Sequence, residues 1–246
     1  MKRAISSFFT AELLCLLVSA SVSAEVLYSN GSPNGTIDAW FISEDGQVAD
    51  SFTLSSIATL TAVDNVGVWA NNPDIPSTVE WSIWNGSGPG GGGTELFGPT
   101  EASWSNTFFA AGTGFNSNYD IYSANFSLPS IVLGPGTYWL QLENGSATNG
   151  GLIGWDQNDG PAGDGTGSQA WQSVTGYLKG PGCGGAGTPP PTGYCSESFE
   201  IIGNSAPEPN SLPVSGSLLV LILFFLRQKR SGSPLRRKIV ARLQRG

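Results

Sequence analysis

The sequence predicts an all-β fold: a single β-sandwich or jelly-roll-like domain over residues 25–206, preceded by a signal peptide and followed by a transmembrane helix. Glycine and proline are frequent, with 34 and 16 residues among 246. Short segments alternate apolar and polar residues, as half-buried strands do. No stretch of the domain has a sustained helical period. Five Asn-Gly pairs supply the positive-φ residues that tight turns require, beginning at Asn30, Asn34, Asn85, Asn144 and Asn149.

Two segments show the alternation most clearly. Residues 78–83 place Val79, Trp81 and Ile83 on one face. The segment from residue 136 ends in a turn at Asn144-Gly145, and its alternation separates two sets of side chains. Tyr138, Leu140 and Leu142 are expected to point inward, and Trp139, Gln141 and Glu143 outward. Further strands are expected over residues 51–54, 58–69, 121–128 and 198–202.

The N-terminus has the order of a secretory signal. Lys2 and Arg3 precede an apolar stretch over residues 13–18, and small residues follow up to Ala24. We expect cleavage after Ala24, so that residues 1–24 are removed during export.

The charges are unevenly distributed along the chain. Residues 25–206 contain 17 Asp and Glu but only one basic residue, Lys179, which gives a net charge of −16. Such a surface repels nucleic acid and anionic lipid. The same span contains 22 aromatic residues, which favours a packed core over disorder.

Two cysteines remain after the signal peptide, Cys183 and Cys195. An even number of cysteines in an exported chain favours a disulfide between them. Two free thiols are the alternative. A zinc site is less favoured, because two sulfurs without histidine supply only half of the usual tetrahedral ligands.

The C-terminus predicts a membrane anchor. Pro207, Glu208 and Pro209 precede an apolar helix over residues 211–226, and a basic cluster of Arg227, Lys229 and Arg230 follows it. At about 1.5 Å per residue the helix spans roughly 24 Å, slightly less than a bilayer core. The basic cluster predicts that residues 231–246 form a cytoplasmic tail and that the acidic domain lies outside.

Together these features resemble the PEP-CTERM sorting signal of Gram-negative bacteria, in which Pro-Glu-Pro, an apolar helix and a basic cluster occur in this order. Segments such as Leu27-Tyr28-Ser29-Asn30-Gly31 and Gly136-Thr137-Tyr138-Trp139-Leu140 resemble exported ectodomains joined to that signal. The resemblance implies an exosortase-like processing enzyme as partner, in hosts that often make exopolysaccharide. It also implies a location at the inner membrane with a periplasmic ectodomain, or sorting to the cell surface or matrix. Here the apolar stretch contains Pro213, and 16 residues follow Arg230.

Little in the sequence points to catalysis. Without histidine the chain lacks the usual serine triad and the commonest general base. Paired carboxylates can hydrolyse glycosides, and four acids lie near aromatic residues: Glu80, Asp120, Glu143 and Asp156. No cofactor is expected. A calcium-binding turn is a weaker hypothesis, with candidate ligands Asp156, Asn158, Asp159 and Asp164.

Three tryptophans are candidates for stacking against sugar rings: Trp139, predicted to face outward, and Trp155 and Trp171 near loops. The sequence therefore predicts a non-catalytic protein of the cell envelope or extracellular matrix. The alternative is a carbohydrate-binding module that acts on exopolysaccharide, and a carboxylate-dependent glycoside hydrolase is less favoured.

Overall fold

A computed structural model describes residues 24–35, 38–158, 170–173 and 196–206. In these residues the chain forms strands and two short 3-10 turns, without an α-helix. Residues 1–23 of the predicted signal peptide, the two cysteines, Asp159, Asp164 and residues 207–246 lie outside the described residues, and with the last range so do the predicted sorting motif, helix and tail.

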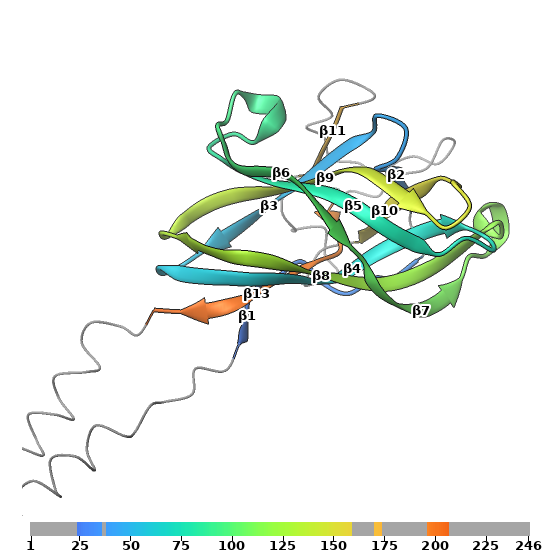
Figure 1. Ribbon diagram of the computed structural model, residues 1–246, viewed down its shortest axis with the longest axis horizontal. Helices are drawn as coiled ribbons and strands as arrows, with labels where there is room; N and C mark the ends of the chain where they lie inside the picture. Colours follow the sequence, from blue (N-terminus) through green and yellow to red (C-terminus); the bar gives the residue numbers. More distant parts are fainter. Residues whose placement is uncertain (1–23, 36–37, 159–169, 174–195, 207–246) are drawn as a thin grey trace, which may run out of the picture. The chain divides into compact units, whose positions relative to one another are not determined.

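The strands form two sheets that face each other (Figure 1). The first sheet has eight strands, and the order of its main path is β1-β13-β4-β10-β12. Strand β2 pairs with β10, β8 pairs with β4, and β7 pairs with β8. The bounds of these strands are β1 (Glu25–Ser29), β2 (Ala39–Phe41), β4 (Ala58–Asn71), β7 (Ser105–Ala111), β8 (Tyr119–Leu133), β10 (Ile153–Asn158), β12 (Ser196–Glu197) and β13 (Glu200–Ser205).

The second sheet has five strands in the order β11-β3-β9-β5-β6. Their bounds are β3 (Gln47–Leu54), β5 (Pro76–Asn85), β6 (Glu95–Ser103), β9 (Gly136–Ala147) and β11 (Ala170–Gln172). The two 3-10 turns are η1 (Pro89–Gly91), between β5 and β6, and η2 (Gly114–Asn116), between β7 and β8. All pairs between these strands are antiparallel. The prediction of an all-β sandwich is confirmed.

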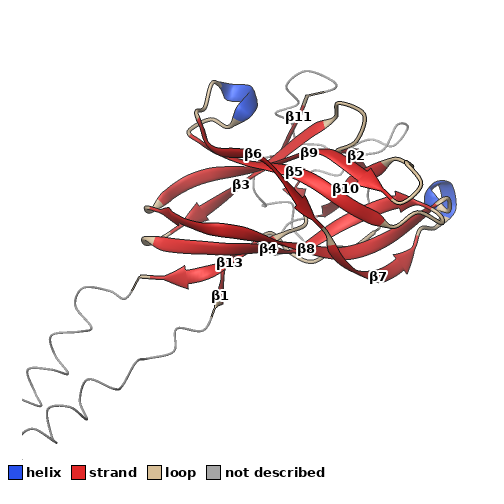
Figure 2. Cartoon of the chain, viewed as in Figure 1, coloured by secondary structure: helices blue, strands red, loops and turns tan. Residues whose placement is uncertain are grey.

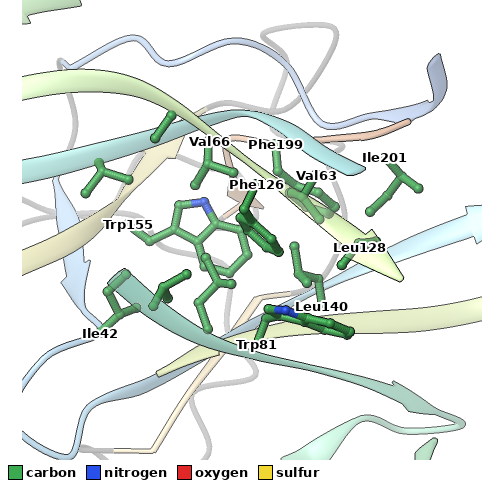
Figure 3. Close-up of a cluster of buried hydrophobic side chains, with 14 of the residues drawn as sticks. Ile42, Val63, Val66, Trp81, Phe126, Leu128, Leu140, Trp155, Phe199 and Ile201 are labelled. Carbon is green, nitrogen blue, oxygen red and sulfur yellow. The ribbon is translucent and has the colours of Figure 1, made fainter. Parts of the chain in front are cut away.

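The core lies between the sheets and is built from alternate residues of their strands (Figure 3). Trp81 and Leu140 come from the second sheet, whereas Phe126 and Trp155 come from the first. Trp81 and Phe126 stack with ring centroids 6.4 Å apart. Burial of such large apolar side chains is the dominant favourable contribution to folding.

One predicted turn is wrong. Asn144-Gly145 does not end the strand, because β9 continues to Ala147. Asn144 instead adopts φ 48° inside the strand, where the pairing of β9 with β5 shifts in register. The turn follows at Asn149-Gly150, where Gly150 has φ 81°. The Asn144-Gly145 pair therefore correctly predicted a residue with positive φ. This residue lies at an irregularity of the strand and not in a turn, because Asn tolerates the left-handed conformation there as well.

The first and the last strand of the sandwich are neighbours in the first sheet. Strands β1 and β13 are paired antiparallel, with Glu25 opposite Gly203 (Figure 1). The Ser205 backbone N–H and hydroxyl both donate to the Glu25 carboxylate, and these bonds lower the pKa of Glu25. The chain therefore enters and leaves the sandwich at neighbouring points.

Candidate functional site

The second sheet has an outer face, turned away from the core, that gathers aromatic and polar side chains. Along β9, Leu140 and Leu142 belong to the core, so the residues that alternate with them point to the other side. We use "outer face" for seven side chains on that side: Glu80, Trp84, Glu101, Trp139, Gln141, Glu143 and Trp171.

The tryptophans of the outer face come from three strands. Trp84 of β5 is directly opposite Trp139 of β9, and Trp171 of β11 is opposite Ala49 of β3. Gln141 is opposite both Ala49 and Ser82, so small residues flank it on the two neighbouring strands. Trp84 donates from its indole N–H to the Ser82 hydroxyl at 2.8 Å.

Three glutamates form a row beside the tryptophans. Glu80 of β5 lies directly opposite Glu143 of β9 on one side and Glu101 of β6 on the other. Side chains in such positions have Cβ atoms about 5 Å apart, and like charges there destabilise a sheet. Amide groups compensate two of them: Gln47 Nε2 donates to Glu143 Oε2 at 2.5 Å, and Asn144 Nδ2 donates to Glu80 Oε2 at 2.8 Å.

The glycine-rich loop of residues 86–93, which contains η1, lies against the outer face (Figure 2). The Trp139 indole N–H donates to the Gly86 carbonyl at 3.1 Å. A Cβ built on Gly88 would lie 2.6 Å from the Trp139 ring, and one built on Gly90 would lie 2.0 Å from Trp171 Nε1. The backbone of this loop therefore packs directly on two indole rings, which requires residues without side chains.

The three predicted stacking tryptophans have different environments. Trp155 is fully buried in the core and donates to the Ser198 carbonyl at 2.8 Å, so its predicted role in sugar stacking is wrong. Trp139 does point away from the core, but the loop leaves it only 4% exposed. Trp171 is half-buried beside the same loop. Trp84 was not among the predicted stacking residues, because its place opposite Trp139 depends on a strand pairing that no local pattern in the sequence reveals.

The four candidate hydrolytic acids are not brought together as one group. Glu80 and Glu143 are neighbours, as described, whereas Asp120 lies on β8 of the first sheet. Asp156 is buried on β10, on the face of the first sheet opposite the core residues Ile153 and Trp155.

Asp156 and Asn158 belong to β10 and not to a calcium-binding turn. The carboxylate of Asp156 accepts the backbone N–H of Asn34 at 2.9 Å, that of Gly35 at 3.2 Å and the Trp69 indole N–H at 2.5 Å. Donors therefore occupy both oxygens, and the interpretation of Asp156 as a calcium ligand is wrong. The Asn158 side chain donates to the Asn30 carbonyl at 2.8 Å, a structural bond. Burial raises the pKa of Asp156 to about 6, although these donors act to lower it.

A second buried carboxylate, Asp50, ties the sheets together. Its Oδ2 accepts the Glu197 backbone N–H at 2.6 Å and the Asn30 side-chain amide at 2.8 Å, and its Oδ1 accepts the Ser51 N–H at 2.6 Å. Because β3 and β12 belong to different sheets, Asp50 links them directly. This acid is structural.

The fully buried Glu197 has fewer hydrogen bonds. Gln157 Nε2 donates to its Oε1 at 3.5 Å, and its Oε2 has no hydrogen-bond partner. Burial, with added repulsion from Asp50 and Asp156, raises the pKa of Glu197 well above its ordinary value.

The described residues contain neither a metal-binding cluster nor a membrane-spanning helix. Among them, no group of three or more His, Cys, Asp or Glu side chains is arranged to hold a metal ion. Within the same part of the chain, no helix has the length and apolar character to cross a membrane.

Comparisons with known proteins give no family for this chain: no protein-family model, no curated protein and no solved structure matches it.

Proposed function

We propose that this protein is an exported, non-catalytic component of the cell envelope or extracellular matrix, held at the membrane or sorted through its C-terminus. One observation carries the proposal. The sandwich begins at Glu25, next to the predicted cleavage point, and its last strand ends at Ser205, two residues before the predicted sorting motif. Because β1 and β13 are paired, the junctions with the predicted signal peptide and with the predicted anchor are at neighbouring points of the sandwich.

The proposed sorting route uses Pro207, Glu208 and Pro209 as a signal for an exosortase-like enzyme. The apolar helix over residues 211–226 would anchor the precursor in the inner membrane, with Arg227, Lys229 and Arg230 on the cytoplasmic side. The ectodomain would then reside in the periplasm of a Gram-negative bacterium or, after sorting, at its surface or in its matrix.

The proposal of a non-catalytic role is supported by the carboxylates of the outer face. Glu80 and Glu143 both accept hydrogen bonds from side-chain amides. A glycoside hydrolase with two carboxylates needs one of them to donate a proton to the leaving group. Of the four candidate acids these two are the neighbours, and both are engaged in hydrogen bonds with side chains of the sheet, which favours a structural or binding role over hydrolysis.

A second candidate function is the binding of exopolysaccharide. Trp84 and Trp171 are partly exposed on the outer face, and the glutamates beside them can accept hydrogen bonds from sugar hydroxyls. Flat rings beside hydrogen-bonding side chains are the usual composition of a small-molecule site.

The first proposal is tested by protease added to spheroplasts that produce the full chain. Residues 25–206 should be digested and a C-terminal epitope after residue 230 protected. Digestion of the epitope with protection of the acidic domain would contradict the proposed orientation, and protection of both would contradict export.

A further inference from the structure

We propose that the loop of residues 86–93 is a lid over a binding site for a neutral polysaccharide, formed by Trp84, Trp139, Gln141 and Trp171. This inference rests on the second candidate function and adds to it the residues, the ligand class and the covering loop.

Gln141 has a buried amide oxygen that lacks a hydrogen-bond donor. Its side chain is 3% exposed, and its amide oxygen has no hydrogen-bond partner. Leaving a buried polar atom unpaired costs about 1–3 kcal/mol, and nothing in the core requires it, because Gln141 points away from the core. An unpaired acceptor in such a place indicates a missing donor, such as a ligand hydroxyl.

Aromatic rings and small side chains surround Gln141 on the outer face. Trp139 precedes it by two residues on the same strand face, and Trp171 flanks its cross-strand neighbour Ala49. A buried amide acceptor therefore has one indole ring two residues along its own strand and a second ring two strands away, with the small residues Ala49 and Ser82 next to it. This combination of flat apolar rings and hydrogen-bonding groups matches the alternating apolar faces and hydroxyl edges of a pyranose ring.

The loop of residues 86–93 covers the two rings with its backbone. The loop contacts both rings, and it contributes backbone rather than large side chains to that contact. Six of its eight residues are glycine, the residue that allows the widest range of backbone conformations, as a loop that opens and closes requires. The hydrogen bonds within the loop and at its base join residues of the same hairpin: Gly88 N–H donates to the Asn85 carbonyl, Gly93 N–H to the Gly88 carbonyl and Thr94 N–H to Asn85 Oδ1. These bonds can persist while the loop moves away from the two rings.

The negative charge around the site favours a neutral ligand. Glu80, Glu101 and Glu143 lie in a row beside the tryptophans, and residues 25–206 have a net charge of −16. A uronic-acid or sulfated polysaccharide would be repelled by this field. A neutral polysaccharide is not repelled, and its hydroxyl groups can donate to these carboxylates.

The test uses the full chain, extracted in a mild non-ionic detergent, in affinity gel electrophoresis. The probes are three neutral polysaccharides, hydroxyethylcellulose, galactomannan and arabinoxylan, with alginate as the anionic comparison. We expect at least one neutral probe to retard the wild type and alginate not to do so. Trp84→Ala and Gln141→Leu should each weaken the retardation about tenfold or more, while Phe108→Ala, which removes an exposed aromatic ring from β7, should not.

The lid is tested by a pair of alanine substitutions in the loop. Gly88 and Gly92 both have positive φ angles, 75° and 83°, but their ψ angles differ. Gly92, at ψ 24°, has the left-handed helical conformation that alanine adopts at moderate cost, whereas Gly88, at ψ −177°, has a conformation that is essentially restricted to glycine. Alanine at position 88 therefore disturbs the loop through its backbone as well as through its side chain. Only the methyl group at position 88 meets the Trp139 ring. Gly88→Ala should displace the loop, increase acrylamide quenching of tryptophan fluorescence and tighten binding several-fold, whereas Gly92→Ala should behave like the wild type.

The outcomes separate the inference from the function on which it rests. Binding that is unaffected by Gln141→Leu, or that responds equally to Gly88→Ala and Gly92→Ala, would overturn the lid and its site but leave polysaccharide binding in place. Retardation by alginate would overturn the neutral ligand class. Absence of retardation for the wild type and for Gly88→Ala on all three neutral probes would overturn both. Gln141→Leu should unfold at the same urea concentration as the wild type or a higher one, so a loss of binding cannot be attributed to unfolding.

Discussion

Replacing the buried Asp156 by asparagine should reduce the dependence of stability on pH. Burial raises the pKa of Asp156 from an ordinary value of 3.8 to about 6. Between these values the folded state binds more protons than the unfolded state, so the free energy of unfolding decreases as the pH rises. The stabilisation by the protonated form is fully present below pH 3.8 and is lost as the pH rises through about 6.

The magnitude follows from the size of the shift. A difference of about 2 pKa units corresponds to about 3 kcal/mol, since each unit is worth roughly 1.4 kcal/mol. Glu197 acts in the same direction, because its pKa is also raised. Between pH 4 and pH 7 the free energy of unfolding of Asp156→Asn should therefore decrease by about 3 kcal/mol less than that of the wild type. The part of the decrease that Glu197 causes should remain. At pH 4 the variant should be less stable than the wild type, since its NH₂ group cannot accept the bonds that Asp156 accepts.

Urea unfolding followed by tryptophan fluorescence at several pH values measures this effect, because all eight tryptophans lie between residues 40 and 171. Asp45→Asn is the matched control, since it removes the same charge from an exposed side chain in a turn where asparagine is equally tolerated. The control should follow the wild-type pH profile. If Asp156→Asn showed the same decrease in stability with pH as the wild type and Asp45→Asn, the assignment of the pH dependence to Asp156 would be refuted.

Three further predictions concern the sandwich. Asp50→Ala leaves several buried donors unpaired and should lower the free energy of unfolding by at least about 3 kcal/mol, measured by urea denaturation. Trp155→Ala should cost about 3–5 kcal/mol in the same assay, whereas Phe108→Ala, 56% exposed in the native protein, should cost less than about 1 kcal/mol. Cys183 and Cys195 should form a disulfide, so intact-mass spectrometry without reduction should show a mass lower by two hydrogens; alkylation of both thiols would contradict this.

The strands of the core were predictable from the sequence because the alternation that defines them is local. Val79, Trp81 and Ile83 of β5 and Leu140 and Leu142 of β9 all lie in the core as predicted. The edge strands β6 and β7 were not predicted, since most of their residues are exposed and no alternation marks them.

The candidate site was predictable only in part. Alternation placed Trp139 and Gln141 on the face opposite the core, but their burial depends on a loop that a local pattern does not place. The row of three glutamates depends on the pairing of β5 with β6 and β9, which is likewise absent from any local pattern.

The burial of Asp156 was not predictable for the same reason. Three of its donors, two backbone N–H groups at residues 34 and 35 and the indole of Trp69, are 87 or more positions away. In the sequence the acid stands at the start of a polar, turn-like segment, and only the fold reveals that β10 is buried along its whole length.

The proposed export and sorting depend most directly on the Pro-Glu-Pro motif, which Glu208→Ala disrupts. The measurement is a blot of inner membrane, outer membrane and medium for the wild type, Glu208→Ala and the neighbouring control Asn210→Ala in the native host. The proposal predicts a processed form in the wild type and in Asn210→Ala, and an unprocessed precursor in the inner membrane for Glu208→Ala. Both changes lie beyond the last strand at Ser205, so the fold of the sandwich should be unaffected. The same size and the same distribution in all three would contradict sorting through this motif.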